Sequence, residues 1–213
     1  MTALAHEAPE AEMSQQDLDA ALFVAWQAAV DKLPEGFRAE IIEGSIEVSP
    51  TGRYSHSEIV NDLRDELVVF LAGSGHVARQ DMNVAHSGGI LIPDLLVAPK
   101  NALPHVTEDG VAIRAAGVDL VVEVVSRGHD SITRDRVRKR RAYARAGIPL
   151  YILIDDYDDG GTVTVLSEPD PQSGVYGGEA RVTYGEAATV PSGPARGFVI
   201  GEAITGPART AAP

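Results

Sequence analysis

The spacing of hydrophobic positions predicts a mixed α/β fold that begins with a helix. Apolar residues recur at helical spacing near the start of the chain, namely Leu18, Ala21, Leu22, Ala25 and Ala29. Ser14 and Asp17 precede them in a capping-box arrangement, which predicts a helix from about Gln15 to Asp31. The segment Leu33-Pro34-Glu35-Gly36 should end it.

Two short runs, 37–43 and 45–49, are joined at Glu43-Gly44 and predict a β-hairpin. Ser55 and Glu58 form a second capping-box pattern, which predicts a helix from Ser55 to about Ala72. On this helix Ile59, Leu63, Leu67 and Phe70 share one face, and His56 lies on the same face in the first turn.

The middle of the chain predicts buried strands around one long helix. Strands are expected at 77–84, 90–97, 118–125 and 150–154, with a helix at about 131–146. The nearly continuous apolar run at 118–125 is typical of a central strand covered on both faces. Strand 118–125, the helix and strand 150–154 form a βαβ unit, which should be parallel and right-handed.

After Asp155, short alternating runs at 162–166, 180–184 and 198–200 predict an antiparallel extension of the same sheet. We expect a disordered tail at 1–13, a single domain at 14–205 and a C-terminal tail at 206–213.

Composition excludes several classes of protein. The 213 residues contain no Cys, which excludes a disulfide scaffold and a Cys nucleophile. No apolar stretch is long enough to span a bilayer, and the first residues do not resemble a secretory signal, so a cytoplasmic protein without membrane contact is expected. No GxGxxG or Walker loop is present, so no nucleotide cofactor is expected.

Charge is unevenly distributed along the chain. The net charge is −13, yet a dense basic run occupies 127–145. Helical geometry places four of its arginines on one face: Arg134, Arg138, Arg141 and Arg145. Such a face is either simply solvated or an anion-binding surface on an acidic protein.

Two carboxylates and one lysine stand out as candidate chemistry. Glu123 interrupts the apolar run 118–125, and a buried carboxylate must be protonated, paired or metal-bound. Asp94 follows Pro93, where it could act chemically or belong to a simple turn. Lys139 lies on the sheet-facing side of its helix, where it either pairs with Asp135 or reaches toward Glu123. Carboxylates with a lysine suit Mg²⁺-assisted phosphoryl chemistry.

At this point the sequence resembles the Uma family of restriction-endonuclease-like proteins, a branch of the PD-(D/E)XK nuclease superfamily. The resemblance spans about Pro34 to Asp155. Five segments carry it: Ala39-Glu40-Ile-Ile-Glu43-Gly44, His56 at a helix start, Pro93-Asp94-Leu-Leu-Val, Val122-Glu123-Val-Val-Ser126, and the segment from Asp135 through Lys139 and Tyr143 to Gly147-Ile.

The resemblance implies a restriction-endonuclease-like α/β fold with a Mg²⁺ (or Mn²⁺) site. In that fold Asp94 and Glu123 would be metal ligands, and the Val124 carbonyl a third. Glu40 would complete or support the metal shell, and Lys139 would be the catalytic lysine. His56 and Tyr143 match supporting positions of the family. The implied partners are nucleic acid, DNA in particular, at the four arginines named above, and a second copy of the chain in a homodimer.

One departure from the general nuclease pattern limits the resemblance. The usual lysine lies two residues after the acidic residue, and here that position is Val125. Lys139 would therefore have to reach the site from the following helix. Three interpretations remain open: a metal-dependent endonuclease, a non-catalytic nucleic-acid- or protein-binding module on the same fold, and a structural Glu123–Lys139 ion pair.

Overall fold

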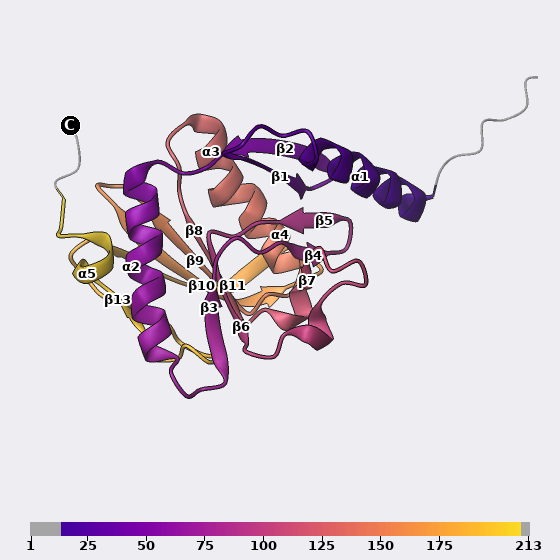
Figure 1. Cartoon of the computed structure of the whole chain (residues 1–213). Helices are drawn as coiled ribbons and strands as arrows, with labels where there is room; N and C mark the ends of the chain where they lie inside the picture. Colours follow the sequence, from indigo (N-terminus) through magenta and orange to yellow (C-terminus); the bar gives the residue numbers. More distant parts are fainter. Residues whose placement is uncertain (1–13, 210–213) are drawn as a thin grey trace, which may run out of the picture.

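The computed structural model describes residues 14–209, which form three sheets with helices packed around them (Figure 1). Residues 1–13, predicted as a tail, and 210–213 lie outside the described residues. The helical segments are α1 (Gln15–Val30), α2 (Tyr54–Phe70), η1 (Leu103–His105), η2 (Ala115–Gly117), α3 (His129–Thr133), η3 (Arg134–Lys139), α4 (Arg140–Arg145) and α5 (Glu202–Thr205). The strands are β1 (Phe37–Ile42), β2 (Ser45–Pro50), β3 (His76–Arg79), β4 (Val84–His86), β5 (Gly89–Leu91), β6 (Leu95–Pro99), β7 (Ile113–Arg114), β8 (Leu120–Val124), β9 (Leu150–Asp155), β10 (Thr162–Asp170), β11 (Val175–Thr183), β12 (Ala188–Thr189) and β13 (Val199–Ile200).

The largest sheet has six strands in the order β11-β10-β9-β8-β6-β3. Only β8 and β9 are parallel in it, and the helical segment α3–η3–α4 connects them, which confirms the predicted βαβ unit. Strands β10 and β11 extend the sheet with antiparallel pairing, as predicted. The expected strand near 198–200 does not join them: β13 pairs only with β12 in a separate two-stranded sheet.

The second sheet has the order β2-β1-β5-β4-β7, and it corrects two predicted strands. Segment 77–84 divides into β3 in the large sheet and β4 in the second sheet, and Asp81 in the break has a φ of 54°. Segment 90–97 divides in the same way into β5 and β6, at Pro93-Asp94. Both halves of each segment lie in sheets, so the apolar pattern continues across the break between them.

The helices also differ in how they begin. Ser14 and Asp17 form the predicted capping box of α1. The second predicted capping box is wrong: α2 begins at Tyr54, and its N-cap Arg53 makes no side-chain capping bond, so Ser55 already lies inside the helix. The third helix begins at His129, and its middle section, η3, is a π-helix.

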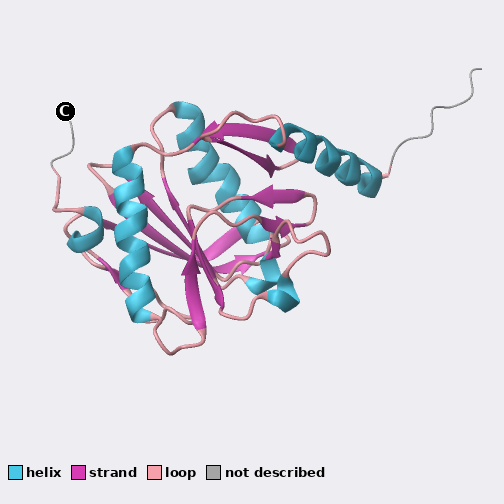
Figure 2. Ribbon diagram, in the orientation of Figure 1, coloured by secondary structure: helices cyan, strands magenta, loops and turns pink. Residues whose placement is uncertain are grey.

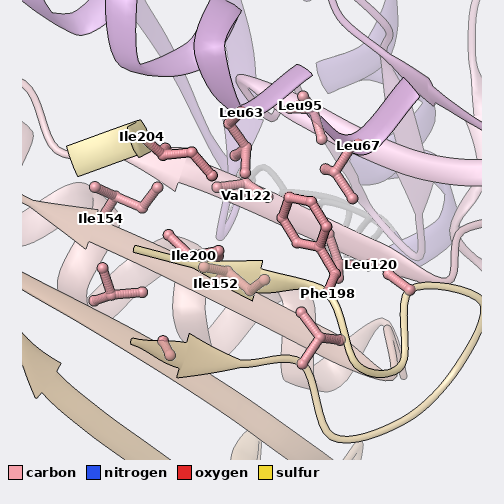
Figure 3. Packing of buried hydrophobic residues seen from close by; sticks show 14 of the residues in the cluster. Leu63, Leu67, Leu95, Leu120, Val122, Ile152, Ile154, Phe198, Ile200 and Ile204 are labelled. Carbon is pink, nitrogen blue, oxygen red and sulfur yellow. The ribbon is translucent and has the colours of Figure 1, made fainter. Parts of the chain in front are cut away.

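The core lies on both faces of the large sheet, which Figure 2 shows between helices. Leu120 and Val122 of β8 point toward α2 and the C-terminal segments (Figure 3), and Val124 belongs to the same buried cluster. Because side chains alternate along a strand, Val121 and Glu123 point to the opposite face, under η3 and α4. No helix within residues 14–209 is both long enough and apolar enough to cross a membrane.

Candidate active site

Separate parts of the fold bring three acidic residues and one lysine together beneath η3. Glu40 lies in β1, Asp94 just before β6, Glu123 in β8 and Lys139 at the end of η3. All four are buried, with Glu40, Glu123 and Lys139 each 2% exposed. Lys139 Nζ is 2.8 Å from Glu123 Oε1 and 2.9 Å from Glu40 Oε1, and it donates to the carbonyl of Ile92. Lys139 therefore contacts Glu123 from the helical segment that follows β8.

Asp94 is held by hydrogen bonds from three directions. Its Oδ2 accepts the Val124 N–H at 2.8 Å and lies 2.9 Å from His56 Nε2, while Arg38 approaches Oδ1 at 3.3 Å. Burial opposes ionisation, but the hydrogen bond and charge of His56, with the charges of Lys139 and Arg38, prevail and lower the pKa of Asp94 to about 2. Asp94 is thus a carboxylate at any ordinary pH.

The surroundings of Glu123 have the opposite effect and raise its pKa. Burial, together with the charges of Asp94, Asp135 and Glu40, outweighs the charge of Lys139 and raises the pKa of Glu123 to about 8. Tyr143 donates its hydroxyl proton to Glu123 Oε1 at 2.5 Å, and burial raises the pKa of Tyr143 well above its ordinary value. Glu123 therefore sits where an additional positive charge would favour its ionised form.

The two buried charged side chains of the π-helix η3 have different partners. Asp135 and Lys139 are both buried, but Asp135 Oδ1 pairs with Arg134 at 2.9 Å while Lys139 pairs with the two glutamates. Of the two roles considered for Lys139, the structure shows the contact with Glu123. π-Helical turns are rare and occur frequently at functional sites.

The predicted arginine surface is largely occupied by acids from the β1–β2 hairpin. Glu43 has φ 50° and Gly44 has φ 78°, as in a tight hairpin turn. Glu43 pairs with Arg138, Arg141 and Arg145, and Arg138 also pairs with Glu47. The fourth arginine, Arg134, lies apart from this group, beside Asp135 and the carboxylate site.

A small cavity of about 20 Å³ adjoins the carboxylates, with Glu40, Asp94, Glu123 and Lys139 in its lining. In the part of the chain that the structure describes, the hydrogen bonds and ion pairs of Glu40 and Glu123 all end on Oε1, so Oε2 of each is left for another partner. Oxygen donors of this kind fit a hard divalent cation. Within residues 14–209, no three acidic or imidazole side chains are already arranged around a common point as metal ligands. The oxygen donors suit a metal, and the Lys139 side chain lines the same cavity.

Sequence reasoning missed Arg38, which contacts Asp94 across 56 positions of the chain. The available signal was its spacing: Arg38 lies two residues before Glu40 in β1, so both side chains leave the same face of the strand. The metal role predicted for the Val124 carbonyl stays a prediction, because the contact that the structure shows is through the Val124 N–H.

Comparison with known proteins identifies the family and a similar fold. No curated protein matches the chain. Among solved structures, the fold is similar to a crystal structure from Anabaena variabilis ATCC 29413, described as a "putative nuclease belonging to DUF820". That match has a TM-score of 0.60 and 20% identity, and it covers 82% of this chain and 93% of the other. Residues 22–193 match the Uma2 family, described as "Putative restriction endonuclease". Because that match covers most of the chain, the protein belongs to the Uma2 family of restriction-endonuclease-like proteins.

Proposed function

We propose that this protein is a Mg²⁺-dependent endonuclease that hydrolyses phosphodiester bonds in DNA. The observation that carries the proposal is the meeting of Asp94, Glu123 and Lys139 around one cavity. Strand β8, the turn before β6 and the end of η3 supply these three side chains. Family membership supports a nucleic-acid substrate.

In this proposal, Asp94 and Glu123 hold the metal, with Glu40 in support and the Val124 carbonyl as a further ligand. When bound, Mg²⁺ stabilises charge on a phosphoryl oxygen and lowers the pKa of a bound water. Asp94 is already ionised and is oriented by His56 and the Val124 N–H. The Lys139 ammonium lies next to Glu123 and would neutralise negative charge that develops on the phosphate.

Tyr143 and Glu40 keep the two central groups in position. The Tyr143 hydroxyl fixes Glu123 through a hydrogen bond, and Glu40 holds Lys139 from the opposite side. DNA contact by Arg138, Arg141 and Arg145 stays a prediction, as does pairing of two chains, and the first requires displacement of Glu43.

Cleavage of supercoiled plasmid DNA in Mg²⁺ or Mn²⁺ tests the proposal. Wild-type protein should nick or linearise the plasmid, and EDTA should stop the reaction. Asp94→Asn, Glu123→Gln and Lys139→Met should each lower the rate by at least about 100-fold, since each removes a group that acts on the reacting phosphate. Glu66→Gln is the matched control, because it makes the same chemical change on the exposed side of α2.

Cleavage that persists in purified Asp94→Asn would reject the assignment. DNA binding without any cleavage by wild-type protein would favour the non-catalytic binding module instead.

A further inference from the structure

A second cavity, of about 180 Å³, adjoins the carboxylate cavity. The two cavities share lining residues, among them His56, Val124, Ser126 and Arg134. The second cavity is also lined by segments at the start of α2 and in the β8–α3 connection, which include Arg53, Ser55 and Arg127. It therefore forms an entrance through which a substrate phosphate could reach Asp94 and Glu123.

Two arginines in this entrance carry charge that the fold does not neutralise. Arg53 and Arg127 are exposed, and in the described chain neither has an acidic side chain within 4 Å. One acidic residue, Asp156, also lines the entrance, but it pairs with Arg209 at 3.0 Å and accepts the Tyr184 hydroxyl. The entrance thus presents positive charge and the Ser55 and Ser131 hydroxyls to solvent.

The entrance differs in this respect from the arginine surface on η3 and α4. Arg138, Arg141 and Arg145 are paired with Glu43, and Arg138 also with Glu47, so much of their charge is already compensated within the protein. In a chain with a net charge of −13, unpaired arginines beside the carboxylate site provide local attraction for an anion.

We propose that Arg53 and Arg127 bind backbone phosphates of the DNA strand, next to the phosphate that enters the carboxylate cavity. The inference rests on the proposed function for its substrate class. Arg53 lies at the start of α2, three residues before His56, and Arg127 lies three residues after Val124. Each arginine is therefore connected by a short segment to a residue that contacts Asp94. The two arginines would thus hold the DNA strand in register with the carboxylate cavity.

The salt dependence of DNA binding tests this inference. Fluorescence anisotropy would measure the affinity for a short labelled DNA duplex over a series of KCl concentrations, in Ca²⁺, with a gel to confirm that the DNA stays intact. The slope of log K against log salt should shrink by about 0.9 for each phosphate that a variant no longer neutralises. Arg53→Gln and Arg127→Gln should each show that change with a several-fold loss of affinity, and the double variant should show about twice the change in slope.

Arg196→Gln is the matched control, because Arg196 is also exposed and also lacks an acidic partner within the part of the chain described. It should keep the wild-type slope. An unchanged slope in the double variant, an equal loss in Arg196→Gln, or no binding by wild-type protein would overturn the inference.

The outcome separates this inference from the proposed function. Plasmid cleavage combined with an unchanged slope in the double variant would reject the two arginines and leave the nuclease assignment intact. The predicted slope change in the variants, together with a wild-type protein that cuts nothing, would support the phosphate-binding role and reject hydrolysis.

Discussion

Lys139 is the internal counter-ion of two buried glutamates. Burial opposes its charge, but Glu123, Glu40 and Asp135 outweigh that effect and raise the pKa of Lys139 above its ordinary value. The pKa values of two surrounding acids shift in opposite directions: that of Asp94 is lowered to about 2, whereas that of Glu123 is raised to about 8. Such a separation is typical of sites where similar groups serve different roles. Here it marks Glu123 as the group whose protonation a bound metal would change.

Metal binding should therefore release a proton from Glu123. Below a pKa of about 8, the metal must displace that proton, so Mn²⁺ affinity should rise as pH rises and then level off above about 8. In the rising range the affinity should change by about tenfold per pH unit. Calorimetry near neutral pH, in two buffers with different ionisation enthalpies, measures the released protons directly.

Glu123→Gln supplies the comparison for this measurement. The variant lacks the titrating carboxyl, so any residual Mn²⁺ binding should release no proton and should lose its pH dependence over this range. The same proton release in the variant as in wild type would show that another group titrates.

At the scale of elements, Glu43 links the β1–β2 hairpin to the helical segment η3–α4 through ion pairs. The Glu43-Gly44 turn brings the Glu43 carboxylate to Arg138, Arg141 and Arg145, nearly 100 positions further along the chain. Hydrogen bonds from Arg141 and its charge lower the pKa of Glu43 despite partial burial. The pairing fixes the strand that carries Glu40 against the helix that carries Lys139.

Glu43→Gln should free the predicted arginine surface. Exposed ion pairs contribute little, so we expect a loss of roughly 1 kcal/mol in the free energy of unfolding, measured by urea denaturation. Non-specific DNA binding should become tighter and steeper in its salt dependence, because Arg141 and Arg145 lose their acidic partner and Arg138 keeps only Glu47.

Glu179→Gln is the control for that substitution, because it removes the partner of a different arginine, Arg140. If Glu43→Gln leaves DNA affinity and slope unchanged, the face formed by Arg138, Arg141 and Arg145 does not contact DNA.

The same elements show how far the sequence could predict this fold. The contact between Glu123 and Lys139 was accessible, because strand alternation and helical spacing place both side chains on facing surfaces. The division of segments 77–84 and 90–97 between two sheets could not be predicted. Hydrophobic periodicity indicates that a residue is buried, but it does not indicate in which sheet the residue lies. The pairs Arg38–Asp94 and Glu43–Arg141 join distant segments, and only the tertiary fold decides them.

At the scale of the whole molecule, the charge of −13 makes general and specific effects of cations difficult to separate. Any salt screens the repulsion among the acidic residues and can stabilise the folded chain. A cation held at Asp94 and Glu123 would act differently, because it binds the folded state alone and stabilises it by mass action.

A cation bound at Asp94 and Glu123 should therefore raise Tm, and the rise should depend on these two carboxylates. At a Mn²⁺ concentration about 100 times its Kd, a single site should add about 2.7 kcal/mol to the free energy of unfolding. For a chain of this length, each kcal/mol raises Tm by roughly 2–4 °C, so wild-type Tm should increase by roughly 5–11 °C relative to EDTA. Asp94→Asn and Glu123→Gln should lose this increase, and Glu66→Gln should keep it, as followed by circular dichroism.

KCl at matched ionic strength measures the screening contribution, which should be the same in all four proteins because they differ by at most one charge. If KCl reproduces the increase in wild-type Tm, or if the increase survives in Asp94→Asn, then it comes from the acidic surface as a whole. That result would reject a metal site at Asp94 and Glu123.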